Sequence, residues 1–202
     1  MSQIDSYHTV PVSAETEIKI KGSKFIGRVF PCFDEIEANQ ILNDIRKKFY
    51  DATHNCFAWR VGINKEVAFK YSDDGEPSGT AGRPIYDQLE GHDLTNVILI
   101  VTRYFGGTKL GTGGLTHAYS DSAARTLKEA GNVERFITDT VSMIVTFAEY
   151  NSVERLIRQS GGTITHSDFT DVVTVTVEIR ASLMERLRAD LIEITSGRVR
   201  FV

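Results

Sequence analysis

The segment from Arg103 to Gly114, called the glycine segment below, has the residue types of an anion-binding loop. Two cations, Arg103 and Lys109, stand among five glycines: Gly106, Gly107, Gly111, Gly113 and Gly114. Backbone N–H groups of a glycine-rich turn that leads into a helix attract anions, because the positive end of the helix dipole lies there. No carboxylate occurs between Asp93 and Asp121, so the local charge is positive. These features predict an anion site at the amino end of a helix.

The glycine spacing excludes two standard nucleotide motifs. The Lys-[Ser/Thr] pair of a P-loop is missing after Gly111, and Thr116 stands where a dinucleotide fingerprint ends in glycine. The rings of Tyr104 and Phe105 offer stacking surfaces for nucleic-acid bases. The alternative is a tight strand-to-helix connection with its aromatic side chains in the core. Five glycines are more than such a connection requires.

A second polar segment, Asp73 to Pro84, is called the acidic loop below. It carries oxygen donors of the kind that divalent cations prefer: Asp73, Asp74, Glu76, Ser78 and Thr80. No glutamate stands at the distance that a calcium loop requires, so we predict no metal site. Two alternatives stay open. The segment is a surface loop whose aspartates cap backbone amides, or an ordered loop beside the glycine segment, with Arg83 as a further phosphate contact.

Other candidates for catalysis are weaker. His54 and Cys56 stand two apart on a predicted strand, which suits a Cys–His nucleophile pair or a buried thiol beside a hydrogen-bonded histidine. The sequence has no zinc-ligand spacing and no serine in a G-x-S-x-G context. We therefore predict no catalytic residue and no cofactor, and favour a non-enzymatic protein, with an enzyme as the open alternative.

The elements around these segments follow from hydrophobic patterning. The apolar run from Val97 to Thr102 is typical of a central strand covered on both faces. A helix after the glycine segment is predicted to end at Gly131. Asp34 with Glu37, and Ser182 with Glu185, match capping boxes that begin two further helices.

The second half of the chain predicts a complete domain. From Thr138 onward, strands and helices follow in the order β-α-β-β-α-β, the ferredoxin-like split unit. The fold class is therefore α+β with two domains, residues 1–135 and 136–202.

Composition sets limits on the partners. Of the residues, 41% are hydrophobic and 25% charged, as in globular proteins, and the net charge is −4. A protein that coats nucleic acid carries a basic excess, so any nucleic-acid site must be a local patch. Cys32 and Cys56 stand in apolar contexts, which favours free buried thiols in a reducing compartment. We expect a cytoplasmic protein without a membrane partner, since no signal peptide or membrane-length apolar run is visible.

Four motifs together resemble the YigZ/IMPACT family: SKFIG (Ser23–Gly27), HNCFAWR (His54–Arg60), DDGEPSGTAGRP (Asp73–Pro84) and RYFGGTKLGTGGLTHAYS (Arg103–Ser120). The resemblance runs from about Thr16 to Ala130. The C-terminal part is similar in pattern to the smaller domain of bacterial members. His117 stands where the family pattern has arginine, so the helix after the glycine segment carries less fixed charge.

The resemblance implies an N-terminal domain like the second domain of ribosomal protein S5. It implies a C-terminal domain similar to the ferredoxin-like last domain of ribosomal translocases, and a link to translation. Eukaryotic members act as regulators that compete for a scaffold of the starvation-responsive kinase, whereas bacterial members have no settled biochemical activity.

Three functions stay open at this point. The first is a non-enzymatic RNA- or ribosome-binding protein that contacts phosphate through Arg83, Arg103 and Lys109, with no DNA sequence specificity. The second is a protein adaptor in translational control. The third is an enzyme that acts on a phosphorylated small molecule with Mg²⁺ held by the acidic loop.

Overall fold

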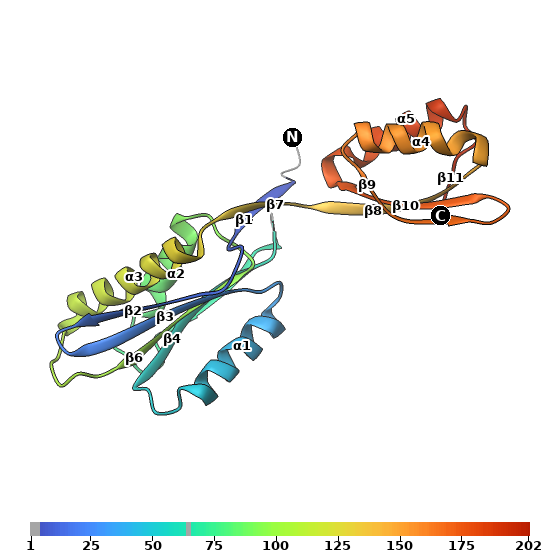
Figure 1. Ribbon diagram of the computed structural model, residues 1–202. Coiled ribbons are helices and arrows are strands. Elements are labelled where there is room, and N and C mark those ends of the chain that lie inside the picture. Colours follow the sequence, from blue (N-terminus) through green and yellow to red (C-terminus); the bar gives the residue numbers. More distant parts are fainter. Residues whose placement is uncertain (1–4, 64–65) are drawn as a thin grey trace. The chain divides into compact units, whose positions relative to one another are not determined.

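The structure, a computed structural model, describes residues 5–63 and 66–202. The chain divides into two compact units, Tyr7–Arg135 and Phe136–Val202, and Asp5 and Ser6 group with the second (Figure 1). Strands β1 (Ser6–Thr9) and β7 (Val133–Phe136) pair with each other near this division. Each unit has its own hydrophobic core, so each is described by itself.

The N-terminal unit is built on one antiparallel sheet in the order β2-β3-β6-β4-β5. Its strands are β2 (Ala14–Ile20), β3 (Ser23–Pro31), β4 (His54–Val61), β5 (Ala68–Ser72) and β6 (Val97–Tyr104). The third position in that order belongs to β6, whose residues Val97 to Arg103 are all buried. The prediction of a central strand over Val97–Thr102 is therefore confirmed.

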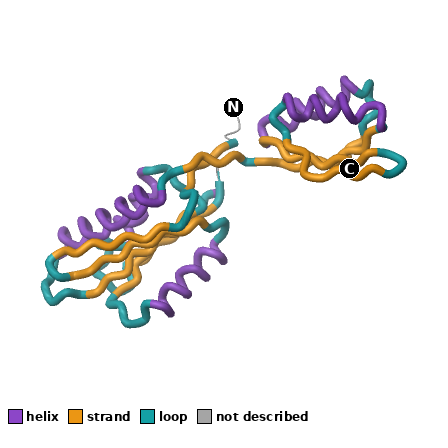
Figure 2. Tube along the Cα trace, viewed as in Figure 1, coloured by secondary structure: helices purple, strands orange, loops and turns teal. Residues whose placement is uncertain are grey.

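Helices cover both faces of this sheet (Figures 1 and 2). On one face lies α1 (Glu35–Lys48), and on the other lie α2 (Gly82–Gly91) and α3 (Gly111–Ala130). Side chains of β6 alternate between the two cores, so Ile98 and Ile100 pack towards α1 while Leu99 and Val101 pack towards α2 and α3. The sheet thus separates two apolar layers, and its strand ends carry the polar segments.

The C-terminal unit is the predicted ferredoxin-like domain. Its sheet has the order β11-β8-β10-β9, with all neighbouring strands antiparallel. Its elements are β8 (Thr138–Val145), α4 (Phe147–Gln159), β9 (Thr163–Phe169), β10 (Val173–Arg180), the short 3₁₀ helix η2 (Ala181–Leu183), α5 (Met184–Ile194) and β11 (Arg200–Phe201). The predicted α+β class and the order of the two domains are confirmed.

One of the two predicted capping boxes is wrong. Asp34 accepts a hydrogen bond from the Glu37 amide at 2.7 Å, as predicted for the start of α1. Ser182, in contrast, lies inside η2, and α5 begins only at Met184 with no side-chain cap. The 3₁₀ turn moves the N-cap position by one residue, from Ser182 to Leu183, and the Ser182 side chain does not cap α5.

Both cysteines are free and buried, as predicted. Burial raises the pKa of the Cys32 thiol to about 12, with a smaller contribution from the nearby Glu37 and Asp34 carboxylates. Cys32 is therefore a protonated core residue under ordinary conditions. Separately, no helix in the described part of the chain is both long and apolar enough to cross a membrane.

Candidate functional site

The acidic loop and the glycine segment meet at the end of β6. Glu76 of the acidic loop is 9% exposed, and its Oε1 accepts from Arg103 Nη1 at 2.5 Å. The same oxygen accepts from the Tyr119 hydroxyl of α3 at 2.8 Å. A buried ion pair therefore joins the two segments, and the acidic loop is ordered against the glycine segment.

Asp73 holds the acidic loop to the start of α2. Its carboxylate accepts from the amides of Gly79, Ala81 and Gly82 at 2.8 to 2.9 Å. Burial alone would raise the pKa of the Asp73 carboxyl, but the three amide hydrogen bonds outweigh it and lower that pKa below its usual value of 3.8. Asp73 thus caps backbone amides, as the first alternative for this loop predicts. The pairing of Glu76 with Arg103 agrees with the second alternative, an ordered loop beside the glycine segment.

Asp74 also has partners within the protein. Its Oδ1 accepts from Arg46 Nη2 at 2.5 Å, and its Oδ2 accepts from the Asn55 amide at 2.7 Å. No group of three or more His, Cys, Asp or Glu side chains within residues 5–63 and 66–202 has a metal-binding arrangement. The carboxylates of the acidic loop serve its own fold and its contact with Arg103.

A buried cluster lies beneath Glu76. The Cys56 thiol donates to the Asp73 carbonyl at 2.9 Å and lies 3.4 Å from the Tyr119 hydroxyl. Burial raises the pKa of both the Cys56 thiol and the Tyr119 hydroxyl. The His54 Nδ1 donates to the Asp74 carbonyl at 2.8 Å, and its Nε2 lies 3.8 Å from Glu76. His54 thus faces the acidic loop, and the thiol is a protonated core group.

The glycine segment is fixed to the turn between β2 and β3. A Cβ atom at Gly106 would lie 1.8 Å from the backbone carbon of Gly22, so only glycine fits this approach. The Gly106 amide donates to Ser23 Oγ at 3.2 Å, and Arg103 Nη2 donates to the same oxygen at 3.3 Å. Gly107 and Gly111 adopt φ values of 85° and 72°, in the left-handed region that favours glycine.

A hollow of about 350 Å³ lies between these segments and the amino end of α3. Its lining residues are Glu76, Pro77, Arg103, Phe105, Lys109, Leu110, Gly111, Thr112 and Leu115. The first turn of α3 contains no acidic residue, and no side chain caps it. Lys109 forms no ion pair with any residue that the structure describes. The hollow therefore combines amide donors, one uncompensated cation and apolar walls.

Three predicted phosphate contacts differ in their accessibility. Lys109 is exposed at the hollow, whereas Arg103 is 5% exposed and already paired with Glu76. Arg83 lies on α2, where it pairs with Asp87 at 2.6 Å and with Glu90 at 4.0 Å. The guanidinium of Arg103 is thus committed to Glu76, and that of Arg83 lies beside two carboxylates of its own helix.

The other residues predicted for the site lie around the hollow's two segments, and several of them bond within the protein. The Tyr104 hydroxyl donates to Asp51 Oδ1 at 2.9 Å, and Lys24 lies 4.9 Å from the ring centroid. Gly113 and Gly114 belong to the first turn of α3. Thr80 is buried and donates to the Pro77 carbonyl at 2.7 Å, whereas Ser78 is exposed.

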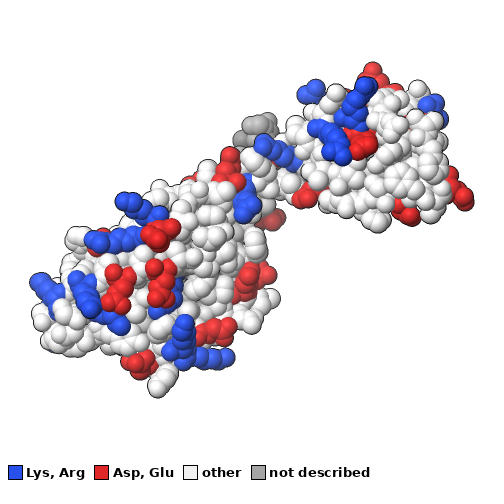
Figure 3. All heavy atoms as spheres, viewed as in Figure 1, with Lys and Arg blue, Asp and Glu red and all other residues white. Residues whose placement is uncertain are grey.

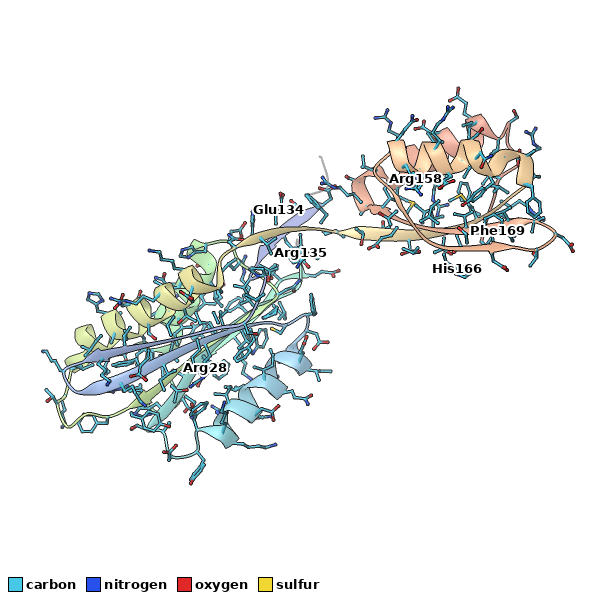
Figure 4. All side chains as sticks on the ribbon, viewed as in Figure 1. Arg28, Glu134, Arg135, Arg158, His166 and Phe169 are labelled. Carbon is cyan, nitrogen blue, oxygen red and sulfur yellow. The ribbon has the colours of Figure 1, made fainter. Side chains whose placement is uncertain are left out.

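The visible face of the N-terminal unit carries no surface of one charge. Lys and Arg side chains stand beside Asp and Glu side chains over this face (Figure 3). A second buried arginine, Arg28 on β3, lies on the face of the sheet that α1 covers (Figure 4). It pairs with Glu15 at 2.5 Å and donates to Thr102 at 3.0 Å. Positive charge that could bind an anion is therefore confined to a local site, as expected for a chain with a net charge of −4.

Sequence reasoning did not identify Ser23 and Tyr119 as partners of the ion pair. Ser23 opens the SKFIG motif, and Tyr119 lies in the motif that begins at Arg103. Both residues are wholly buried. The sequence signal that could have identified them is that both residues lie within the motifs shared with the family.

The two units match two sequence profiles. One, described as Impact N-terminal domain, matches residues 21–127, and the other, described as Domain of unknown function (DUF1949), matches residues 143–198. A solved structure of a hypothetical protein superimposes with a TM-score of 0.69 at 28% identity, covering 99% of this chain and 98% of that one.

Curated relatives are similar along nearly the whole chain. IMPACT family member YigZ of Escherichia coli (strain K12) is 29% identical over 195 residues, which cover 96% of each sequence. IMPACT family member YvyE of Bacillus subtilis (strain 168) is 34% identical over 195 residues, which cover 96% of this chain and 89% of the relative. The resemblance seen in the motifs is confirmed, and the chain belongs to the IMPACT family.

Proposed function

We propose that this protein is a non-enzymatic RNA- or ribosome-binding protein in the control of translation, which holds a phosphate at the amino end of α3. The link to translation comes from the family resemblance. The observation that carries the binding role is the hollow, because its amide donors and Lys109 have no carboxylate partner among the described residues. The cytoplasmic location stays a prediction.

The buried cluster supports a binding role over catalysis. Cys56 and Tyr119 are held protonated by burial, so neither is an activated nucleophile at neutral pH. The acidic loop directs its carboxylates to amides and arginines within the fold. We therefore do not propose the Mg²⁺-dependent enzyme.

A salt titration tests the proposal. RNA oligonucleotides and ribosomes of the source cell should bind at low salt, and their affinity should fall steeply as salt rises. Lys109→Ala should lower the slope of the log–log salt plot by about 1, because one phosphate contact is lost. Lys128→Ala is the matched control, since Lys128 is an exposed lysine at the other end of α3. If neither RNA nor ribosomes bind, the proposal is wrong.

A protein adaptor in translational control is the second candidate. The apolar walls of the hollow, formed by Pro77, Leu110 and Leu115, favour it. Affinity capture of translation components that Lys109→Ala reduces, in the absence of RNA binding, would support this candidate instead.

A further inference from the structure

We propose that the hollow receives one unstacked nucleotide of single-stranded RNA, with its base against Phe105 and its phosphate at the amino end of α3. This inference rests on the proposed function and names the ligand class for that same site.

The size of the hollow sets the first limit. Its volume of about 350 Å³ lies at the lower end of the range for small-ligand sites, roughly 300–1,000 Å³. A space of this size admits a single nucleotide but not a base-paired helix. Proteins that read RNA with such sites take bases that are splayed out of a single strand. The geometry therefore favours single-stranded RNA over a duplex.

Phe105 supplies a stacking surface at the hollow. Its side chain is 48% exposed, and its backbone amide donates to Thr53 Oγ1 at 3.0 Å, which fixes the position of the residue. The guanidinium of Arg103 lies 5.6 Å from the centroid of its ring. Leu110 and Leu115 line the same hollow as this ring and add apolar surface to it.

The phosphate position follows from the donors. The amino end of α3 presents uncapped amides, and Lys109 stands beside them. Arg103 lines the same hollow, and its buried Nε has no hydrogen-bond partner among the described residues. Glu76 is the acidic residue of the lining, and Arg103 neutralises it. The side chains that line the hollow therefore carry a net positive charge, which comes from Lys109.

The combination of groups favours a nucleotide over an acidic peptide. A peptide carboxylate would use Lys109 and the α3 amides equally well. A planar base, however, also stacks on the exposed part of the Phe105 side chain, which an aliphatic acidic side chain cannot do.

Three RNA probes distinguish binding of the base from binding of the phosphate. Fluorescence anisotropy at low salt would compare a short oligouridylate, an abasic oligomer of the same length and a duplex of the same length. The oligouridylate should bind about 5- to 150-fold more tightly than the abasic oligomer, as expected for one stacked base. Equal affinity for both would overturn the inference and leave phosphate binding intact. Equal affinity for oligouridylate and duplex would overturn it as well.

A variant pair locates the base. Phe105→Ala should weaken oligouridylate binding about 5- to 150-fold and leave abasic binding unchanged. Phe33→Ala is the matched control, because Phe33 is an exposed phenylalanine outside the hollow, 66% exposed. Phe105→Trp keeps the stacking surface, and its fluorescence should be quenched by oligouridylate but not by the abasic oligomer.

Two further outcomes are distinguishable. If Phe105→Ala and Phe33→Ala bind alike while Lys109→Ala weakens binding, the base lies elsewhere and only the proposed function stands. If no RNA binds but an acidic, apolar peptide quenches Phe105→Trp, both the inference and the RNA proposal are wrong, and the adaptor role is favoured.

Discussion

Two polar segments meet at the end of β6, and they use their charged groups in opposite ways. In the acidic loop, Asp73, Asp74 and Glu76 each bond to groups within the N-terminal unit. In the glycine segment, Lys109 and the first amides of α3 face the hollow without such partners among the described residues.

This difference indicates a structural role for the acidic loop and a ligand-binding role for the glycine segment. A buried charge whose partner is supplied by the fold stabilises the arrangement of segments, whereas an uncompensated donor at a hollow is available to a ligand. The acidic loop therefore acts as a clamp that positions the glycine segment.

The largest effect is expected from breaking the clamp. Glu76→Ala leaves the Arg103 guanidinium buried without a counter-charge and removes the acceptor of the Tyr119 hydroxyl. Loss of one partner of a buried ion pair should lower the free energy of unfolding by about 3–5 kcal/mol. Urea unfolding followed by the fluorescence of Trp59 reports on the N-terminal unit, since this single tryptophan is buried in its core.

Glu129→Ala is the control for this variant, because Glu129 is an exposed residue of α3. It should leave the unfolding midpoint nearly unchanged. If Glu76→Ala is no more destabilising than Glu129→Ala, the clamp interpretation is wrong.

The second prediction concerns stability and compares a glycine required for close packing, Gly106, with a glycine in the first turn of α3, Gly113. Gly106→Ala forces a methyl group against Gly22 and should cost about 1–3 kcal/mol of stability, as overpacking does. Gly113→Ala meets no atom within 4 Å, and alanine favours a helix over glycine by up to about 1 kcal/mol. The same urea titration should therefore show opposite changes for the two variants, and equal changes would contradict the assignment.

Local patterning predicted most of the fold. The apolar run of β6 indicated burial on both faces, and the alternation from Val141 to Val145 with the following helix and strands gave the ferredoxin-like order. These signals succeed because each depends on neighbours within one element. The start of α5 was missed because a 3₁₀ turn and a capping box share the same residue types.

The candidate site was predictable only in part, for a physical reason. The positive charge around Arg103 was inferred from the absence of acidic residues nearby in the sequence. In the fold, however, Glu76 comes from a distant segment and pairs with Arg103. Lys109 has no such partner among the described residues, and nothing in the local sequence distinguishes these two cations.

A third prediction concerns the cap formed by Asp73. Asp73→Asn removes the charge that the Gly79, Ala81 and Gly82 amides stabilise, and should cost about 1–2 kcal/mol at neutral pH. The pKa of Asp73 is lowered in the folded state, so its contribution is present above the unfolded pKa and is lost as pH falls through the lower folded value. The stability difference between wild type and variant should therefore shrink below about pH 4. A difference that stays constant down to pH 2 would contradict this role.

The smallest effect is expected at Arg83, which lies on the acidic-loop side of the comparison. Its side chain is half exposed and pairs with Asp87 and Glu90 on its own helix, so Arg83→Ala should leave the unfolding midpoint unchanged within error. Because those two carboxylates already offset its charge, the variant should also bind RNA as wild type does, with an unchanged salt slope. The RNA affinity of Arg83→Ala is then compared with that of Lys109→Ala. If both variants weaken RNA binding equally, the binding surface extends from the hollow onto α2, and the two segments do not divide into clamp and binding surface.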